Sequence, residues 1–147
     1  MSIGLEQAKA IIAAAQRKAA EVGKPVTVVV VDSGGFPIAS ERMDGARPLT
    51  TSIATAKAYT AAVMQRPTRM LKGWADSQPT FFSQVSRMGH HPIVATDGGL
   101  TLKRGGQFLG GVGVAGGTGE DDQEIAVAAV CACEFDLEFA EFNSVKR

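Results

Sequence analysis

The residues with the clearest chemical meaning form a glycine-rich turn that runs directly into a group of acidic residues. Glycine recurs through 110–119, and three carboxylate side chains follow it. Glycines let a ligand or another backbone approach closely. A helix that begins after such a turn presents free N–H groups to anions, including carboxylates. The candidate ligand-binding residues of this turn are Gly116, Gly117 and Thr118.

The same residues also have a purely structural interpretation. Thr118 is suited to be the N-cap of a helix, and Glu120, Asp121 and Asp122 favour the positive end of the helix dipole. These acids occupy the position that a bound anion would take, and no Lys-Ser or Lys-Thr pair follows the glycines, so the turn is not a P-loop. Capping and a neighbouring small-molecule pocket both stay open, with Asp122 a candidate for proton transfer.

The only histidines are the adjacent pair His90 and His91. Neighbouring side chains on an extended loop point in opposite directions, so we expect no shared metal site. No Cys-x-x-Cys or His-Glu-x-x-His motif supplies further ligands. Either histidine is a candidate axial ligand of a haem iron, and His90 is a candidate general base. The alternative is a loop histidine pair without a special role.

Three charged residues outside these motifs are further candidates. Arg42 lies in a loop with Asp44 and Arg47, where a guanidinium can pair with the carboxylate of a ligand or of Asp44. Lys57 lies among alanines in the middle of an expected helix, and its ammonium can reach a ligand or a carboxylate. Asp32 ends the first expected strand. Its default role is to form the turn, and it is also a candidate catalytic residue.

The hydrophobic pattern predicts an alternation of helices and hairpins. The first helix runs over 5–22, because Gly23 supplies a left-handed stop and Pro25 prevents continuation. Hairpins dominate the remaining pattern, which predicts an α+β fold with a largely antiparallel sheet covered by helices. The expected strands are 26–31, 36–41, 93–96, 100–102 and 108–114, and the later helices are 51–65, a short one from Pro67 to Trp74, and 120 to about Phe139.

Composition bounds the class of protein. The 147 residues predict one domain over 1–147, and 45% hydrophobic residues suffice for one core. Fifteen basic and fifteen acidic residues give no net charge, which argues against nucleic-acid binding. We expect no membrane segment, because no apolar run approaches about 20 residues. With no signal-peptide pattern, and with Cys131 and Cys133 badly placed to bridge, we expect a cytoplasmic location.

Four segments together resemble the GlcG/HbpS family, which is also found as the C-terminal domain of some corrinoid adenosyltransferases. They are 30–35, 41–46, 56–61, and 113–117 followed by Asp122. The resemblance implies a profilin-like fold, with a five-stranded antiparallel sheet flanked by helices and assembly into dimers up to octamers. Members include haem-binding proteins with haem-degrading or redox-sensing roles, and proteins encoded near glycolate metabolism. Two departures are Ala115, where the family usually has Ser, and a loop after Gly98-Gly99 without the frequent Pro.

Haem binding is the first function that these observations favour. In that hypothesis an apolar pocket walled by Trp74, Phe81 and Phe82 holds haem or another small ligand, and Arg42 and Lys57 face its propionates.

Two alternatives come from different classes. One is a small enzyme of the lyase, deaminase or tautomerase type that acts on a carboxylate-bearing metabolite. Arg42 would clamp the carboxylate, while His90, Asp32 or Asp122 would move protons. The other is a homo-oligomeric accessory protein, in which the alanine- and glycine-rich surfaces only make subunit contacts.

Overall fold

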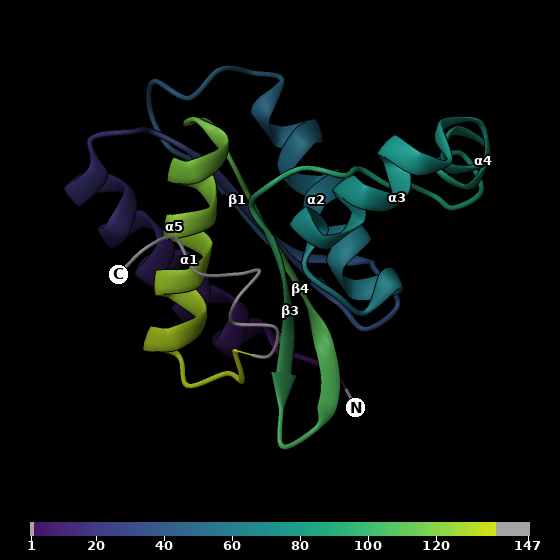
Figure 1. The fold of residues 1–147 in the computed structure, drawn as a ribbon. Helices are drawn as coiled ribbons and strands as arrows, with labels where there is room; N and C mark the ends of the chain where they lie inside the picture. Colours follow the sequence, from purple (N-terminus) through teal and green to yellow (C-terminus); the bar gives the residue numbers. More distant parts are fainter. Residues whose placement is uncertain (1, 138–147) are drawn as a thin grey trace.

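A computed structural model describes residues 2–137. Their elements form an α+β fold in which one antiparallel sheet lies between two layers of helices (Figure 1). The elements, in chain order, are α1 (Leu5–Val22), β1 (Thr27–Asp32), β2 (Pro37–Arg42), α2 (Thr50–Met64), a 3₁₀ turn (Thr68–Leu71), α3 (Lys72–Ser77), α4 (Pro79–Val85), β3 (Gly99–Arg104), β4 (Gln107–Ala115) and α5 (Gly119–Ala132).

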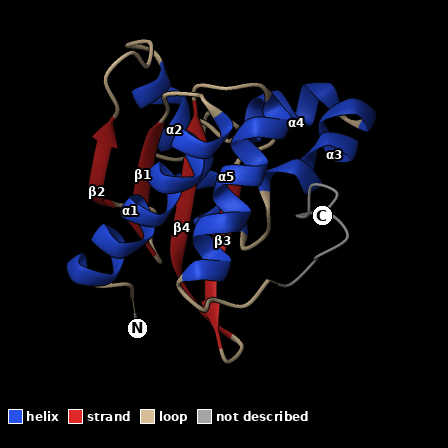
Figure 2. Ribbon diagram, turned by 90° about the vertical axis from the view of Figure 1, so that its left-hand side faces the viewer, coloured by secondary structure: helices blue, strands red, loops and turns tan. Residues whose placement is uncertain are grey.

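The sheet of the described residues has four strands in the order β2-β1-β4-β3, and every neighbouring pair is antiparallel (Figure 2). The expected five strands are therefore wrong, because the segment 93–96 is not a strand. Its backbone pairs elsewhere. The Ile93 N–H donates to the Ser86 carbonyl at the end of α4, and the Val94 N–H donates to the Thr60 hydroxyl of α2.

Helices α1 and α5 cover one face of the sheet (Figure 1), and this face carries the main apolar core. Alternate residues of each strand point to this face, as the two-residue period of a strand requires. They meet Ile11 and Ile12 of α1 and Ile125 of α5. The buried strand residues of this core are Val28, Val30, Leu100, Leu102, Leu109, Val112 and Val114.

The opposite face packs against α2 through much smaller side chains. Val29 and Val31 of β1 meet Ala54, Ala58 and Ala62. On β4 the residues that face α2 are Gly111, Gly113 and Ala115. A Cβ added at Gly113 would collide with the Ala54 carbonyl and lie 2.6 Å from the Ala58 nitrogen. The backbones of α2 and β4 therefore touch, and the glycines are what permits it.

The first helix confirms its predicted bounds, and Gly23 takes the left-handed conformation with φ 78°. The last helix does not follow its prediction. It ends at Ala132 instead of near Phe139, and Phe139 lies outside the described residues. After the helix, Phe135 is buried under the Arg104 guanidinium, and the Asp136 N–H donates to the Lys103 carbonyl of β3. These tertiary contacts draw the chain back across the sheet.

Within residues 2–137, no helix has both the length and the apolar character needed to cross a membrane.

Candidate functional site

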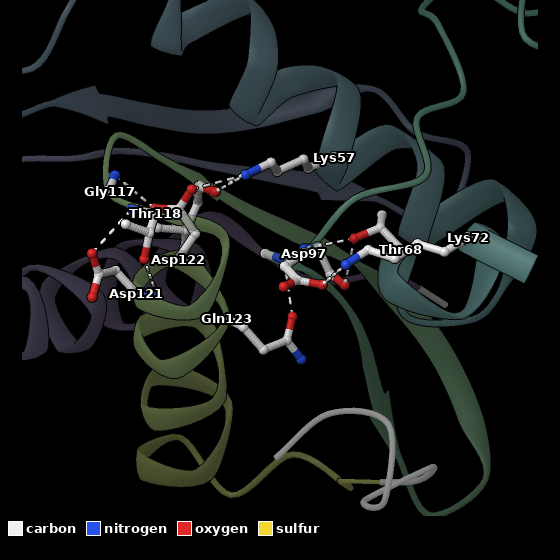
Figure 3. A network of polar contacts seen from close by, with 12 residues as sticks. Lys57, Thr68, Lys72, Asp97, Gly117, Thr118, Asp121, Asp122 and Gln123 are labelled. Carbon is white, nitrogen blue, oxygen red and sulfur yellow. Dashed lines mark hydrogen bonds and ion pairs between the residues drawn. The ribbon is translucent and has the colours of Figure 1, made fainter. Parts of the chain in front are cut away.

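Lys57 of α2 and Asp122 of α5 form a buried ion pair between the two helices (Figure 3). The Lys57 Nζ lies 3.0 Å from Asp122 Oδ2 and also donates to the Val114 carbonyl at 2.7 Å. The two side chains are 4% and 5% exposed. The close approach of α2 to β4 brings the lysine in, and glycine at 113 leaves room for its Cβ. Of the two roles predicted for the Lys57 ammonium, it takes the one of reaching a carboxylate.

Asp122 also organises the glycine-rich turn. Its second oxygen, Oδ1, accepts a hydrogen bond from the Gly117 N–H at 2.9 Å. The Thr118 hydroxyl accepts from the Asp121 N–H, and the Asp121 carboxylate accepts from the Thr118 N–H. Thr118 is thus the N-cap, as its structural interpretation predicted. The hydrogen bond from the Thr118 backbone lowers the pKa of Asp121. The chain's own carboxylates take the donors that an anion would have used.

Opposing effects set the charge state of Lys57. Burial lowers the pKa of its ammonium, while the charges of Asp122 and Asp97 and the hydrogen bond to Asp122 raise it, and the pKa stays below its ordinary value. Gly98 closes the other side of the pair, since a Cβ there would lie 2.9 Å from the Lys57 Nζ. Its φ of 108° also favours glycine.

A second polar network, which the sequence did not predict, surrounds Asp97 (Figure 3). The carboxylate of Asp97 accepts from Arg69 Nε at 3.1 Å and pairs with Lys72 Nζ at 2.8 Å. Burial raises the pKa of Asp97, but the hydrogen bonds and charges of the two cations outweigh it and hold that pKa below its ordinary value. Beside it, the Gln123 side chain accepts from the Gly98 N–H. In the sequence, Asp97-Gly98-Gly99 has only the pattern of a turn.

A hollow of about 250 Å³ opens above the Lys57–Asp122 pair, and we call it the Lys57 pocket. It brings together four predicted residues, Lys57, Asp122, Gly116 and Gly117, whereas Arg42 does not line it. Arg42 is exposed at the end of β2, and the arginine at this pocket is Arg47. The other lining residues are Leu49, Thr50, Ile53 and Ala115.

The two histidines lie together, not apart. Their ring centroids are 5.0 Å from each other, and both rings contact Tyr59 of α2 edge-on. The expectation of opposite directions is wrong because the chain bends here instead of running extended. His90 is stacked on Phe36 at 4.5 Å with an interplanar angle of 7°. Residues 2–137 contain no group of three or more His, Cys, Asp or Glu side chains that could hold a metal ion.

His91 lines a second hollow of about 370 Å³ beside the exposed N-terminal half of α2, which we call the His91 hollow. Burial and the neighbouring His90 lower the pKa of His91. The imidazole is therefore neutral at neutral pH. The other lining residues are Thr51, Ser52, Thr55 and Pro92.

Asp32 has the turn-forming role that was its default interpretation. Its Oδ1 accepts from the N–H groups of Gly34 and Phe36, at 2.9 and 3.0 Å. These hydrogen bonds close the hairpin between β1 and β2. Its catalytic role, like that of His90, stays a prediction.

The aromatic side chains that were predicted to wall a ligand pocket line neither hollow. Trp74 packs edge-on against Phe82 at 4.9 Å and Phe81 at 6.1 Å. Trp74 and Phe82 also pack against a small cluster formed by Tyr59, Leu71 and Ile93. None of these three aromatics lines the Lys57 pocket or the hollow that contains His91.

Comparison with known proteins gives a consistent result. A family model described as haem degrading protein HbpS-like matches residues 3–131. The chain is 32% identical over 132 residues to Corrinoid adenosyltransferase PduO of Citrobacter freundii. That match covers 90% of this chain but only 39% of PduO. It is 35% identical over 110 residues to Protein GlcG of Escherichia coli K12, covering 75% of this chain and 78% of GlcG.

Among solved structures, a crystal structure of a PduOC:heme complex superimposes with a TM-score of 0.82 at 28% identity. The match covers 92% of this chain and 98% of that one.

Proposed function

This chain belongs to the family of HbpS-like haem-degrading proteins, and from that premise we propose that it binds haem, with His91 as the axial ligand of the iron. The single observation that carries the proposal is the similarity to PduOC, a relative of the same fold that was crystallised with haem.

The His91 hollow supports the ligand assignment. Haem iron is bound by the neutral form of an imidazole, and the lowered pKa of His91 favours that form. His90 is the weaker candidate, because its ring is stacked on Phe36 and its Nε2 lies 3.5 Å from the Gly34 carbonyl. A volume of about 370 Å³ also falls within the range of about 300–1,000 Å³ that is usual for small-ligand sites.

The residues around the hollow fit part of what haem needs. The hydroxyl groups of Thr51 and Ser52 offer hydrogen bonds to propionates, whereas the Thr55 hydroxyl already donates to the Thr51 carbonyl. We assign the propionates to the Thr51 and Ser52 hydroxyls and not to Lys57, because Lys57 does not line the His91 hollow. When bound, haem would supply a redox-active iron, and the role of this chain is to position it and to ligate it through His91.

A haemin titration followed by absorbance tests the proposal. We expect a saturable Soret shift in the wild-type protein and a weakening of about tenfold or more in His91→Ala, which loses the axial ligand. Binding should persist somewhat below the ordinary histidine pKa of about 6.5 and weaken as the pH falls through the lowered pKa of His91.

His90→Ala decides between the two histidines. If that variant loses the Soret shift and His91→Ala keeps it, the ligand assignment is wrong. If the wild-type protein shows no saturable shift, haem binding itself is wrong.

A further inference from the structure

We propose that the Lys57 pocket is a separate binding site for a small organic acid. The carboxylate of the acid pairs with Arg47, and a hydroxyl or carbonyl oxygen next to the carboxylate accepts a hydrogen bond from Lys57. The site lies over the Lys57–Asp122 pair and does not include His91. The two sites share no lining residue.

The size of the pocket sets the first limit on its occupant. Its volume of about 250 Å³ is below the range of about 300–1,000 Å³ that holds drug-sized ligands and cofactors. A metabolite with a short carbon skeleton is the class of ligand that this volume fits.

The charges that line the pocket select an anion. Lys57 and Asp122 cancel each other, which leaves the single positive charge of Arg47. Asp122 does not repel an incoming carboxylate strongly, because its two oxygens already accept from Lys57 and Gly117. Within residues 2–137 the exposed Arg47 guanidinium forms no ion pair, so its planar fork is available to a carboxylate.

Lys57 then selects a second oxygen atom. An ammonium has three N–H donors, and two of them are used by the Val114 carbonyl and Asp122. The described part of the chain offers no acceptor for the third N–H, although the side chain is only 4% exposed. A buried donor left without an acceptor destabilises a protein by about 1–3 kcal/mol. A ligand hydroxyl or carbonyl oxygen in the pocket removes that deficit.

Two apolar side chains at the pocket indicate the remaining part of the ligand. Leu49 is 67% exposed and Ile53 is 39% exposed, and both line the same hollow as Arg47. A short hydrocarbon group on the acid would cover them. The expected ligand class is therefore a 2-oxo or 2-hydroxy acid with a small apolar chain.

Heteronuclear NMR with 2-oxoisovalerate as the probe tests this site in the intact protein. Saturable shifts are expected at the amide resonances of Gly116 and Gly117, which line the pocket. Arg47→Gln should weaken the binding about tenfold or more, because the partner of the carboxylate is lost. Arg66→Gln is the matched control, since Arg66 is an equally exposed arginine beyond the other end of α2, and it should bind like the wild type.

Isovalerate, which lacks the second oxygen, tests the role of Lys57. The wild type should prefer 2-oxoisovalerate, and Lys57→Met should lose that preference. Because Lys57→Met removes one partner of a buried ion pair, its folding is checked by the same spectra, and Arg47→Gln keeps the test valid if that variant unfolds.

Two results would overturn the proposal. One is the absence of saturable shifts at Gly116 and Gly117 in the millimolar range, and the other is equal binding in Arg47→Gln and wild type. Haemin titration of Arg47→Gln separates the two sites, since that variant should retain the Soret shift of the wild type.

Discussion

Toward α1 and α5, the strands present valine and leucine side chains to a continuous apolar core, whereas toward α2 they present two valines of β1 and the glycines and Ala115 of β4. The first face is held by the area of hydrocarbon that it removes from water. The second face is held by backbone contact, which leaves little space for side chains. Polar groups that enter it, such as Lys57, must find partners within the protein.

This contrast locates the functional part of the molecule. Both hollows lie beside α2, and the buried ion pair lies where α2 crosses β4 and meets α5. A close-packed seam of backbone holds such groups in fixed positions, because neither the helix nor the strand can shift without collision. The face toward α1 and α5 supplies the stability, and the face toward α2 supplies the geometry.

The largest effect is expected from a cavity in the face toward α1 and α5. Leu102→Ala removes a fully buried side chain and should lower the free energy of unfolding by about 2–5 kcal/mol, measured by urea denaturation. The control is Leu5→Ala, which truncates a side chain that is 49% exposed and should change stability by less than about 0.5 kcal/mol. Equal losses in both variants would remove the basis for treating this face as the main core.

On the α2 side the damaging change is an addition. Gly113→Ala places a methyl group against the backbone of Ala54 and Ala58 and should lower the free energy of unfolding by about 1–3 kcal/mol. Gly73→Ala adds the same methyl group in α3, where nothing lies within 4 Å, and should be neutral or stabilise by about 0.5–1 kcal/mol. If Gly113→Ala is as stable as the wild type, the backbones are not in the contact described.

The smallest effect concerns the network around Asp97 and is seen only at acid pH. Because the pKa of Asp97 is lowered in the folded state, its contribution to stability is present above about pH 4. That contribution is lost as the pH falls through the folded pKa. Asp97→Asn should flatten this part of the stability-versus-pH curve, measured by urea denaturation between neutral and acid pH. Asp76→Asn, which replaces an exposed carboxylate, should give the same curve as the wild type. An identical curve for both variants would contradict the ion pairs of Asp97.

The sequence predicted most elements because their patterns are local. The stop at Gly23 fixed α1, and Asp32 formed the predicted turn. The segment 93–96 has the side chains of a strand, but its N–H groups pair with Ser86 and Thr60, which no local pattern indicates. The end of α5 is likewise decided by contacts of Phe135 with distant residues.

For the site, the same division holds. The pairing of Lys57 with a carboxylate could be predicted from the sequence, since the lysine lies among alanines on the small-residue side of its helix. Choosing Arg47 over Arg42 was not, because both lie near the same loop and only the three-dimensional course of the chain separates them. Asp97 was missed because its partners, Arg69 and Lys72, are distant from it in the sequence, and only the packing of the chain brings them together.

The backbone contact between α2 and the glycines of β4 also determines which positions of α2 tolerate substitution. On the side toward β4, a larger side chain at Ala54 or Ala58 would displace a strand. Selection for folding from a library of variants at those positions would therefore recover mostly alanine. On the opposite side, Ser52 and Ile53 border the two hollows and are exposed. The scaffold therefore accepts new ligand preferences through a few outward positions of one helix, while the position of that helix stays unchanged.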